Sequence, residues 1–303
     1  MQTSATTLCW SPVSLAVLAR YAAYWQREGT VSADYTPANL FAWDNTYHQS
    51  IAFVGDRATV RITEDGVNFR YLFPVGTGDP TLAIEALLAE AKATAQPLVL
   101  VGVTEAQLAT LSPALLARFS IEETRDFADY LYSAEALATL AGKKLHGKRN
   151  HVNAFSAAHK WQAVPLTPVL FPHCREILAA WQAESEFPDH GEQDAILRAL
   201  AAWSELSLSG AVLFADGKPV AFTVGEMIGE DTLCVHFEKA LPAWRGAYPV
   251  INREFVRMMR EKHPVLALIN REDDMGLPNL RAAKLSYHPL QFVKKFCLRA
   301  GDL

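Results

Sequence analysis

The residues best suited to chemistry lie between positions 236 and 289 of this 303-residue chain. His236 and Glu238 stand two residues apart in a run with the composition of a β-strand, so both side chains are expected on one face of a sheet. Either group could take a proton from an attacking amine or hydroxyl if it lies within hydrogen-bonding distance. The alternative is a half-buried polar pair beside a turn, because this spacing is common.

A second group of polar residues follows the apolar run VLALIN, which is expected to form a buried strand. Asn270, Arg271 and Glu272 would then lie in a loop at the carboxyl end of that strand, where open sheets bind their ligands. We therefore predict that these three residues bind substrate or donor. Asp273 and Asp274 extend the run, and the alternative for them is to cap the next helix and complement its dipole.

Two further candidates lie on or just after the next predicted helix, PNLRAAKL: Lys284 is in it and Tyr287 follows it. Pro278 suits its first turn, and Lys284 lies near its end, where an ammonium could hold a phosphate or stabilise an oxyanion. Tyr287 could donate a proton to a leaving group, although buried tyrosines near a closing strand are more often structural. We predict that Glu238, His236, Lys284 and Tyr287 are catalytic.

A basic segment lies near the middle of the chain, which has no Asp or Glu between Ala136 and Arg175. Its positive residues are Lys143, Lys144, Lys148, Arg149, Lys160 and Arg175. Helical spacing would bring Lys144 and Lys148 to one face, and Arg149 follows directly. The segment predicts an anionic partner such as a tRNA arm, a CoA phosphate, a nucleotide-linked precursor or a phospholipid head group. The alternative is a solvated helix face.

The composition excludes several classes of protein. A net charge of -5 and a pI near 6.0 argue against a surface devoted entirely to nucleic acid or anionic lipid. The four cysteines are far apart, so the sequence predicts neither a metal site nor a disulfide framework. The chain lacks a secretory signal pattern and a run of roughly 20 apolar residues, and we expect a cytoplasmic protein.

The pattern of predicted elements places these residues on two α/β (α+β) domains. Residues 50–73 read as a short antiparallel meander, followed by a helix after Pro80 and an apolar strand. Residues 209–240 read as a second meander, followed by a helix from Pro249 and the strand VLALIN. The run PNLRAAKL reads as a last helix, and one closing strand, QFVKKFCLR, completes the second half. We predict domains at residues 1–145 and 146–303.

Four stretches carry a resemblance to a known family: NLFAWDNTY, GKKLHGKRNHVNAF, HFEKA and INREDDMGLPNLRAAKLSYHP. From about Pro37 to its end the chain resembles an uncharacterised bacterial family related to the C-terminal catalytic domain of phosphatidylglycerol lysyltransferase. The resemblance implies two tandem GNAT-like domains, each a mixed, mainly antiparallel sheet flanked by helices, similar to the Fem peptidyltransferases. The K-x-x-[FY]-x-P pattern of those relatives matches Lys284, Tyr287 and Pro289.

The same resemblance implies the kind of reaction. It indicates an acyl- or aminoacyltransferase that moves a group from aminoacyl-tRNA or acyl-CoA to an amine or hydroxyl, such as a phospholipid head group or a cell-wall precursor, with no other cofactor required. The Gly-rich pyrophosphate loop of acetyl-CoA-dependent relatives is reduced here to Arg245, Gly246 and Ala247, which are predicted to bind a donor phosphate. The alternative is a non-catalytic module of the same fold that binds an anionic ligand.

Overall fold

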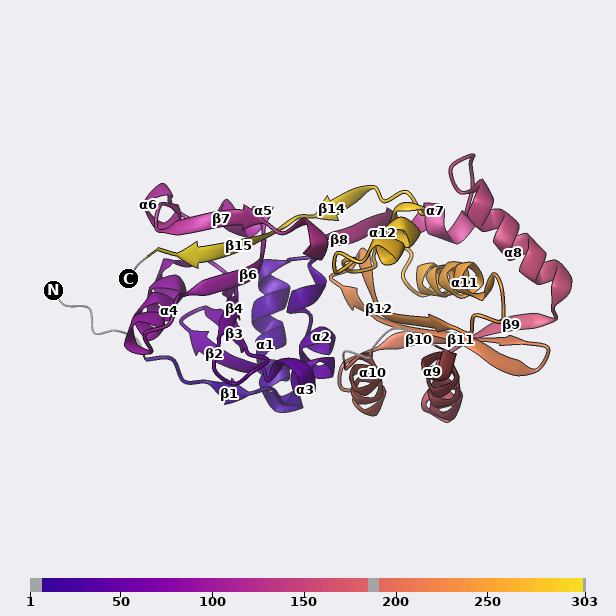
Figure 1. The fold of residues 1–303 in the computed structure, drawn as a ribbon, viewed down its shortest axis with the longest axis horizontal. Coiled ribbons are helices and arrows are strands. Elements are labelled where there is room, and N and C mark those ends of the chain that lie inside the picture. The colour runs from indigo at the N-terminus through magenta and orange to yellow at the C-terminus, as the bar shows by residue number, and fades with distance from the viewer. Residues whose placement is uncertain (1–6, 185–190, 302–303) are drawn as a thin grey trace. The chain divides into compact units, whose positions relative to one another are not determined.

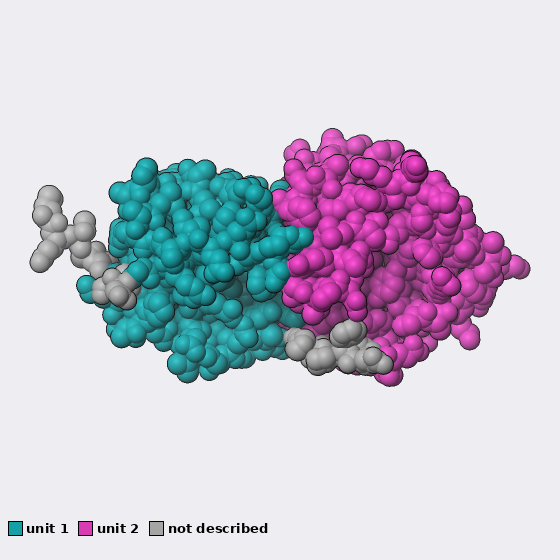
Figure 2. All heavy atoms as spheres, turned by 45° about the horizontal axis from the view of Figure 1, so that its top comes forward, with its two compact units in different colours: residues 1–128, 293–303 teal, residues 129–292 magenta. Residues whose placement is uncertain are grey.

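The computed structural model describes residues 7–184 and 191–301. The chain divides into two compact units, unit 1 of residues 1–128 with 293–303 and unit 2 of residues 129–292 (Figure 2). The boundary predicted near residue 145 lies inside unit 2, because the strand Asp129–Ser133 pairs within the sheet of that unit. Residues 1–6, part of the stretch from which the lack of a secretory signal was predicted, lie outside the described residues.

Unit 1 is built on an eight-stranded sheet with the order β1-β2-β3-β4-β6-β15-β7, in which β5 also pairs with β3. Its strands are β1 (Ser11–Pro12), β2 (Ser50–Val54), β3 (Arg57–Ile62), β4 (Arg70–Leu72), β5 (Val75–Gly76), β6 (Val99–Thr104), β7 (Phe119–Glu123) and β15 (Lys295–Ala300). Its helices are α1 (Leu15–Glu28), α2 (Pro37–Ala42), α3 (Asp44–Tyr47), α4 (Thr81–Ala93), α5 (Glu105–Leu108) and α6 (Pro113–Leu116), with single 3-10 turns at Ala33–Tyr35 and Arg125–Phe127. The predicted meander, helix and strand of the first half correspond to β2–β4, α4 and β6.

Unit 2 contains a seven-stranded sheet with the order β14-β8-β13-β12-β11-β10-β9. Its strands are β8 (Asp129–Ser133), β9 (Trp161–Pro165), β10 (Ser209–Ala215), β11 (Lys218–Ile228), β12 (Thr232–Ala240), β13 (Leu268–Asn270) and β14 (Gln291–Val293). Its helices are α7 (Ala134–Thr139), α8 (His146–Ala158), α9 (Phe171–Glu184), α10 (Glu192–Ala201), α11 (Ala247–Lys262) and α12 (Pro278–Leu285), with a 3-10 turn at Pro168–Leu170. All neighbouring pairs from β9 to β12 are antiparallel, whereas β12 and β13 run parallel.

Helices cover both faces of the unit 2 sheet. Figure 1 shows α11 on one face of β10–β12 and α9 and α10 on the other. The apolar side of α11 explains this placement, since Val250, Ile251, Phe255 and Val256 are fully buried and belong to the same core as Leu213 of β10. This packing fixes the position of the strand ends that carry the predicted site residues.

The predicted closing strand is divided between the two units. Residues 291–293 form β14 in the sheet of unit 2, whereas residues 295–300 form β15 between β6 and β7 in unit 1. The prediction of one continuous strand is therefore wrong. The physical reason lies at Lys295, which is fully buried in unit 1 and donates a hydrogen bond to Asp34 at 2.8 Å.

Among the described residues, the structure has no helix that is both long enough and apolar enough to cross a membrane. The cysteines Cys9, Cys174, Cys234 and Cys297 are free thiols.

Candidate functional site

The candidate site lies where β12 and β13 part. The two strands pair only between Thr232–Cys234 and Leu268–Asn270. Beyond this point β12 continues to Ala240, whereas β13 ends at Asn270. Side chains from β12 and from the loop after β13 lie where the two strands diverge. This is the carboxyl end of β13, where ligand-binding residues are expected in an open sheet.

A β-bulge in β12 sets the direction of His236. Val224 of β11 pairs with Phe237, but the next residue, Gly225, pairs with Val235, so His236 is the extra residue of the bulge. A Cβ atom on Gly225 would lie 2.1 Å from the carbonyl oxygen of Cys234, so only glycine fits this turn of the ladder. His236 and Glu238 consequently contact different partners, although their spacing in a regular strand predicts a shared face.

Glu238 is the centre of one group of contacts, which we call the guanidinium cluster: Glu238, Asn252, Arg271, Tyr287 and Lys148. Its carboxylate accepts hydrogen bonds from Arg271 Nη2 at 2.9 Å and from Asn252 Nδ2 of α11 at 3.1 Å. The Arg271 guanidinium carbon lies 4.9 Å from the centre of the Tyr287 ring. The Lys148 ammonium of α8 lies 4.0 Å from the centre of the same ring.

One donor of the guanidinium cluster is not used. Arg271 Nη1 is buried and has no hydrogen-bond partner of good geometry among the residues that the structure describes. A buried donor without an acceptor is costly, and such groups in native proteins call for an explanation. A ligand oxygen next to Glu238 would supply the missing acceptor.

The charges within this cluster influence one another. Burial lowers the pKa of Arg271, but the Glu238 carboxylate and the Tyr287 and Tyr132 hydroxyls outweigh it, and the pKa rises overall. Burial, and then the charge of Arg271, lowers the pKa of Lys148. Burial raises the pKa of Tyr287 to about 12, with Arg271 opposing the rise. At neutral pH the cluster therefore offers a hydroxyl that keeps its proton beside two cations.

His236 is the centre of a second group, which we call the imidazole cluster: Cys234, His236, Glu226 and Glu272. Its Nε2 lies 3.0 Å from Glu226 Oε1, and its Nδ1 lies 2.7 Å from Glu272 Oε1 and 3.7 Å from Cys234 Sγ. Burial alone would lower the pKa of His236, but Cys234 and then the two carboxylates raise it well above its usual range. His236 is thus held as a cation, and Glu238 is the better candidate for a general base.

The loop after β13 is held in place by groups that were predicted to act in chemistry. Lys284 Nζ donates a hydrogen bond to the carbonyl oxygen of Arg271 at 2.6 Å and another to that of Asp273. Asn270 is fully buried, donates to Asp129 at 3.0 Å, and accepts from the backbone N–H of Glu272 at 2.7 Å. Glu272 adopts a φ of 56°, an uncommon conformation for a residue with a side chain. Lys284 and Asn270 therefore shape the loop that presents Arg271 and Glu272.

Asp274 ties this loop to the start of α12. Its carboxylate is fully buried and accepts from Arg281 Nε at 2.9 Å, from Arg281 Nη2 at 2.7 Å, from the Gly276 N–H at 3.0 Å and from the Tyr130 hydroxyl. Gly276 has a φ of 73°, which agrees with the turn predicted there. Asp273 accepts from the Met275 N–H at 2.9 Å. The local turn and an ion pair across it account for the acidic run.

The chain can now be compared with known proteins. Residues 27–299 match the family described as phosphatidylglycerol lysyltransferase, C-terminal. The chain belongs to this family.

Solved structures share this family's fold. A conserved protein of unknown function from Bacteroides thetaiotaomicron is 32% identical, covers 97% of this chain and 100% of its own, and superposes with a TM-score of 0.90. The C-terminal domain of a putative lysylphosphatidylglycerol synthetase from Agrobacterium fabrum is 17% identical with a TM-score of 0.69, over 95% of this chain and 93% of its own. A tandem GNAT protein from the clavulanic acid pathway is 11% identical with a TM-score of 0.56, over 98% and 99%. The likeness to the tandem GNAT protein shows that this chain, with its two mainly antiparallel sheets flanked by helices, has a GNAT-like mixed α/β fold.

A curated relative of the chain is itself described without an activity. An uncharacterized protein of Mycoplasmoides gallisepticum is 26% identical over 176 residues, and the match spans 56% of this chain and 56% of that protein. The chain thus matches little more than half the length of this relative.

The residues of the basic segment differ in whether they reach the site. Lys148 reaches Tyr287, but Lys143 and Lys144 are exposed and lie before α8. Arg149 Nη1 donates to the carbonyl oxygens of Leu140 at 2.5 Å and Gly142 at 3.2 Å, so it holds the end of α7. Of the predicted ligand-binding residues in this segment, only Lys148 joins the guanidinium cluster.

The predicted phosphate-binding loop is covered by α8. Gly246 has a φ of 100° and stands just before α11. A Cβ at this position would lie 2.8 Å from the carbonyl oxygen of His151 and 3.2 Å from Cβ of Phe155, both in α8. Arg245 is exposed beside it. The glycine therefore allows two helices to approach closely, which is a packing role.

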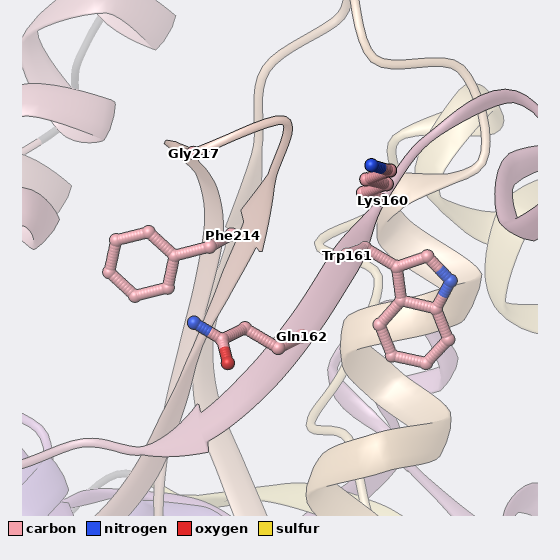
Figure 3. Close-up of a pocket in the computed structure, with 5 residues that line it drawn as sticks. All are labelled: Lys160, Trp161, Gln162, Phe214 and Gly217. Carbon is pink, nitrogen blue, oxygen red and sulfur yellow. The ribbon is translucent and has the colours of Figure 1, made fainter.

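A hollow of about 350 Å³ lies elsewhere in unit 2. It is lined by Lys160, Trp161, Gln162, Phe214 and Gly217, none of which belongs to either cluster. Figure 3 shows Gln162 and Phe214 extending to one side of the strands and the Trp161 ring to the other. Of these residues, only Lys160 is one of the positive residues of the predicted basic segment.

Sequence reasoning missed four members of the site. Glu226 and Cys234 face each other across β11 and β12, Asn252 comes from α11, and the hydroxyl of Tyr132 on β8 donates to the carbonyl oxygen of Lys284 at 2.9 Å. The pairing of strands around the bulge would have indicated Glu226 and Cys234. No local pattern marks Asn252 or Tyr132, because each reaches the site through tertiary packing.

Proposed function

We propose that the chain is an aminoacyltransferase whose reaction takes place at the guanidinium cluster of unit 2. Membership of the lysyltransferase family supports this kind of reaction, and so does a GNAT-like fold with the order meander, helix and strand in both units. The observation that carries the proposal is the pairing of the Glu238 carboxylate with the Arg271 guanidinium, whose buried Nη1 has no hydrogen-bond partner of good geometry among the described residues. We interpret the two units as tandem GNAT-like domains.

The proposed step is the attack of a hydroxyl or amine on the carbonyl carbon of an aminoacyl ester. Glu238 accepts the proton of the attacking group as the new bond forms. Arg271 Nη1 and the Lys148 ammonium stabilise the negative charge that develops on the carbonyl oxygen. Collapse of the intermediate breaks the ester bond, and the leaving oxygen takes a proton from Tyr287, whose raised pKa keeps its hydroxyl protonated. That phenolate then regains the proton held by Glu238.

We propose aminoacyl-tRNA rather than acyl-CoA as the donor. An acyl-CoA would place its phosphates at the start of α11, but the backbone of α8 packs against Gly246 there. A polyanionic donor still finds positive charge on the exposed Lys143 and Lys144 before α8. The acceptor is proposed to be a hydroxyl or amine of a lipid head group, by analogy with the substrate in the family's name.

A mixture of charged tRNAs allows transfer to be measured whichever amino acid the protein uses. Purified chain is incubated with tRNA charged with a mixture of radiolabelled amino acids and with vesicles containing phosphatidylglycerol, and label is counted in the organic phase. A parallel reaction contains radiolabelled acetyl-CoA. We expect label from charged tRNA only, and a decrease in rate on the order of 10²–10⁴ for Glu238→Gln, the range for loss of a general base.

The control variant is Glu230→Gln, which makes the same chemical change at an exposed turn of unit 2 and should leave the rate unchanged. Transfer from acetyl-CoA alone would overturn the choice of donor. Binding of tRNA or vesicles without transfer in either reaction would instead assign the chain as a binding module. A Glu238→Gln variant with the wild-type rate would remove Glu238 from the reaction.

A further inference from the structure

The imidazole cluster has a composition and arrangement that the proposed transfer reaction does not use. Cys234 Sγ, His236 Nδ1 and a carboxylate oxygen of Glu272 all lie within 4.8 Å of one another. Cys234 is fully buried, and the His236 side chain is 3% exposed. A thiol, an imidazole and a carboxylate that converge in this way are the three kinds of side chain that bind Zn²⁺.

We propose that Cys234, His236 and Glu272 form a binding site for a single transition-metal ion of the zinc class. These side chains are separate from the guanidinium cluster, so the site does not depend on the transfer reaction. Thiolate and imidazole ligands favour such ions over Mg²⁺ and Ca²⁺, which bind oxygen. Three protein ligands leave a fourth position of a tetrahedral ion open.

The distances suit this ion. With bonds of about 2.3 Å to sulfur and about 2.0–2.1 Å to nitrogen, a tetrahedral Zn²⁺ holds these two ligand atoms roughly 3.6 Å apart. Cys234 Sγ and His236 Nδ1 lie 3.7 Å apart. Glu272 Oε1 is closer to Nδ1, at 2.7 Å, because a hydrogen bond joins them. Glu272 is the most exposed member of the three, at 24%, so its carboxylate can move back to admit the ion.

Glu226 supplies the support that a metal-binding imidazole needs. Its Oε1 accepts a hydrogen bond from His236 Nε2 at 3.0 Å, and its side chain is 7% exposed. A carboxylate on the far nitrogen fixes the ring and directs the other nitrogen towards the metal. The bulge at His236, which Gly225 makes possible, turns the ring to this position.

The exchange of ions is balanced. The incoming dication replaces two protons, the one shared between Nδ1 and Glu272 and the one on Cys234. The charge of the cluster therefore stays the same when the metal binds, and two protons are released to solvent. The buried neighbours of the cluster need no rearrangement of charge.

The test uses the reduced full chain after treatment with a chelator and removal of that chelator. Co²⁺ is titrated in, and the near-ultraviolet charge-transfer band that marks a thiolate–cobalt bond is recorded. All proteins carry Cys9→Ser, because Cys9 is an exposed thiol that could bind cobalt outside the cluster. We expect one equivalent of Co²⁺ to produce the band, one equivalent of Zn²⁺ to abolish it, and Zn²⁺ to raise the thermal midpoint.

Two variants separate the cluster from other thiols. Cys234→Ser should lose the band, whereas Cys174→Ser, which removes a buried thiol from α9, should keep it. Glu226→Gln should keep the band and weaken affinity by about 10–100-fold, the usual effect of losing a supporting carboxylate. Absence of a stoichiometric band in the protein that retains Cys234, or the same band in Cys234→Ser, would overturn the proposal. The first of these results needs no folded variant.

Discussion

Replacement of Asp274 by asparagine tests whether the acidic run after β13 is structural. The substitution keeps the size of the side chain and removes its charge. Oδ2 accepts from Tyr130 and from Arg281 Nε, and Oδ1 accepts from Arg281 Nη2 and from the Gly276 N–H. An amide NH₂ group must therefore face donors in either orientation. The better orientation directs it to the Tyr130 hydroxyl, which can rotate to accept, but leaves it opposite Arg281 Nε.

The expected loss follows from burial. Removing one partner of a buried ion pair costs about 3–5 kcal/mol, because the other charge stays uncompensated. The Arg281 side chain is 34% exposed and can regain water, whereas Asp274 is fully buried. We therefore expect the lower end, about 3 kcal/mol in the free energy of unfolding. For a domain of about 150–250 residues, the size class of unit 2, this lowers the thermal midpoint by roughly 6–12 °C.

The loss should depend on pH in a defined direction. Although burial raises the pKa of Asp274, Arg281, Tyr130 and the Gly276 N–H hold it well below its usual range. A carboxylate with a lowered folded pKa contributes stability above its unfolded pKa of about 4, and the contribution disappears as the pH falls towards the folded value. The difference between wild type and Asp274→Asn should thus be constant above about pH 5 and shrink below pH 4.

The measurements are urea and thermal unfolding followed by circular dichroism between pH 3 and pH 8. Glu230→Gln, at an exposed turn, provides the control for removal of one negative charge. A midpoint for Asp274→Asn equal to that of the control would refute the structural role. So would a difference that stays constant down to pH 3, because the ionised carboxylate would then not be its source.

Two further changes test the elements that hold the site. Lys284→Met keeps the apolar stem but leaves two loop carbonyls without their donor, so we expect the free energy of unfolding to fall by about 2 kcal/mol. Lys262→Met, on the exposed side of α11, should cause no change, and equal urea midpoints for the two variants would contradict this prediction. Gly225→Ala brings a Cβ within 2.1 Å of the Cys234 carbonyl oxygen and should lower the free energy of unfolding by at least about 3 kcal/mol. Gly147→Ala, in open space on α8, should instead raise it by about 0.5–1 kcal/mol. Equal thermal midpoints for the two alanine variants would show that the bulge accepts a side chain.

Local sequence signals predicted most of the secondary structure around the site. The runs that became β10–β12 are apolar and broken by turn residues, and the helix predicted from Pro249 became α11, with its boundary moved to Ala247. These signals depend on neighbours in the chain. The division between β14 and β15 depends instead on Lys295, whose ammonium pairs with Asp34 far away in the sequence. A lysine within a strand pattern gives no sign of burial.

The site was predictable to the extent that strand ends determine it. Arg271 and Glu238 lie within hydrogen-bonding distance because Glu238 is on β12 and Arg271 directly follows β13, the strand next to it. The separation of His236 from Glu238 was not predictable, since it results from the bulge, whose cause is a close approach at Gly225. The ammonium of Lys284 was expected to face a substrate, but it lies on backbone carbonyls that exist only once the loop has folded.

The assignment of β15 to unit 1 has a consequence for the order in which the chain can fold during synthesis. Unit 2 is continuous in sequence, whereas the sheet of unit 1 needs a strand that is translated after all of unit 2. That strand lies between β6 and β7 rather than at an edge. Domains fold as they emerge from the ribosome, so unit 2 can complete its sheet while unit 1 still exposes unpaired strands. In nascent chains, protease resistance should therefore appear first in unit 2, the later of the two units to begin synthesis.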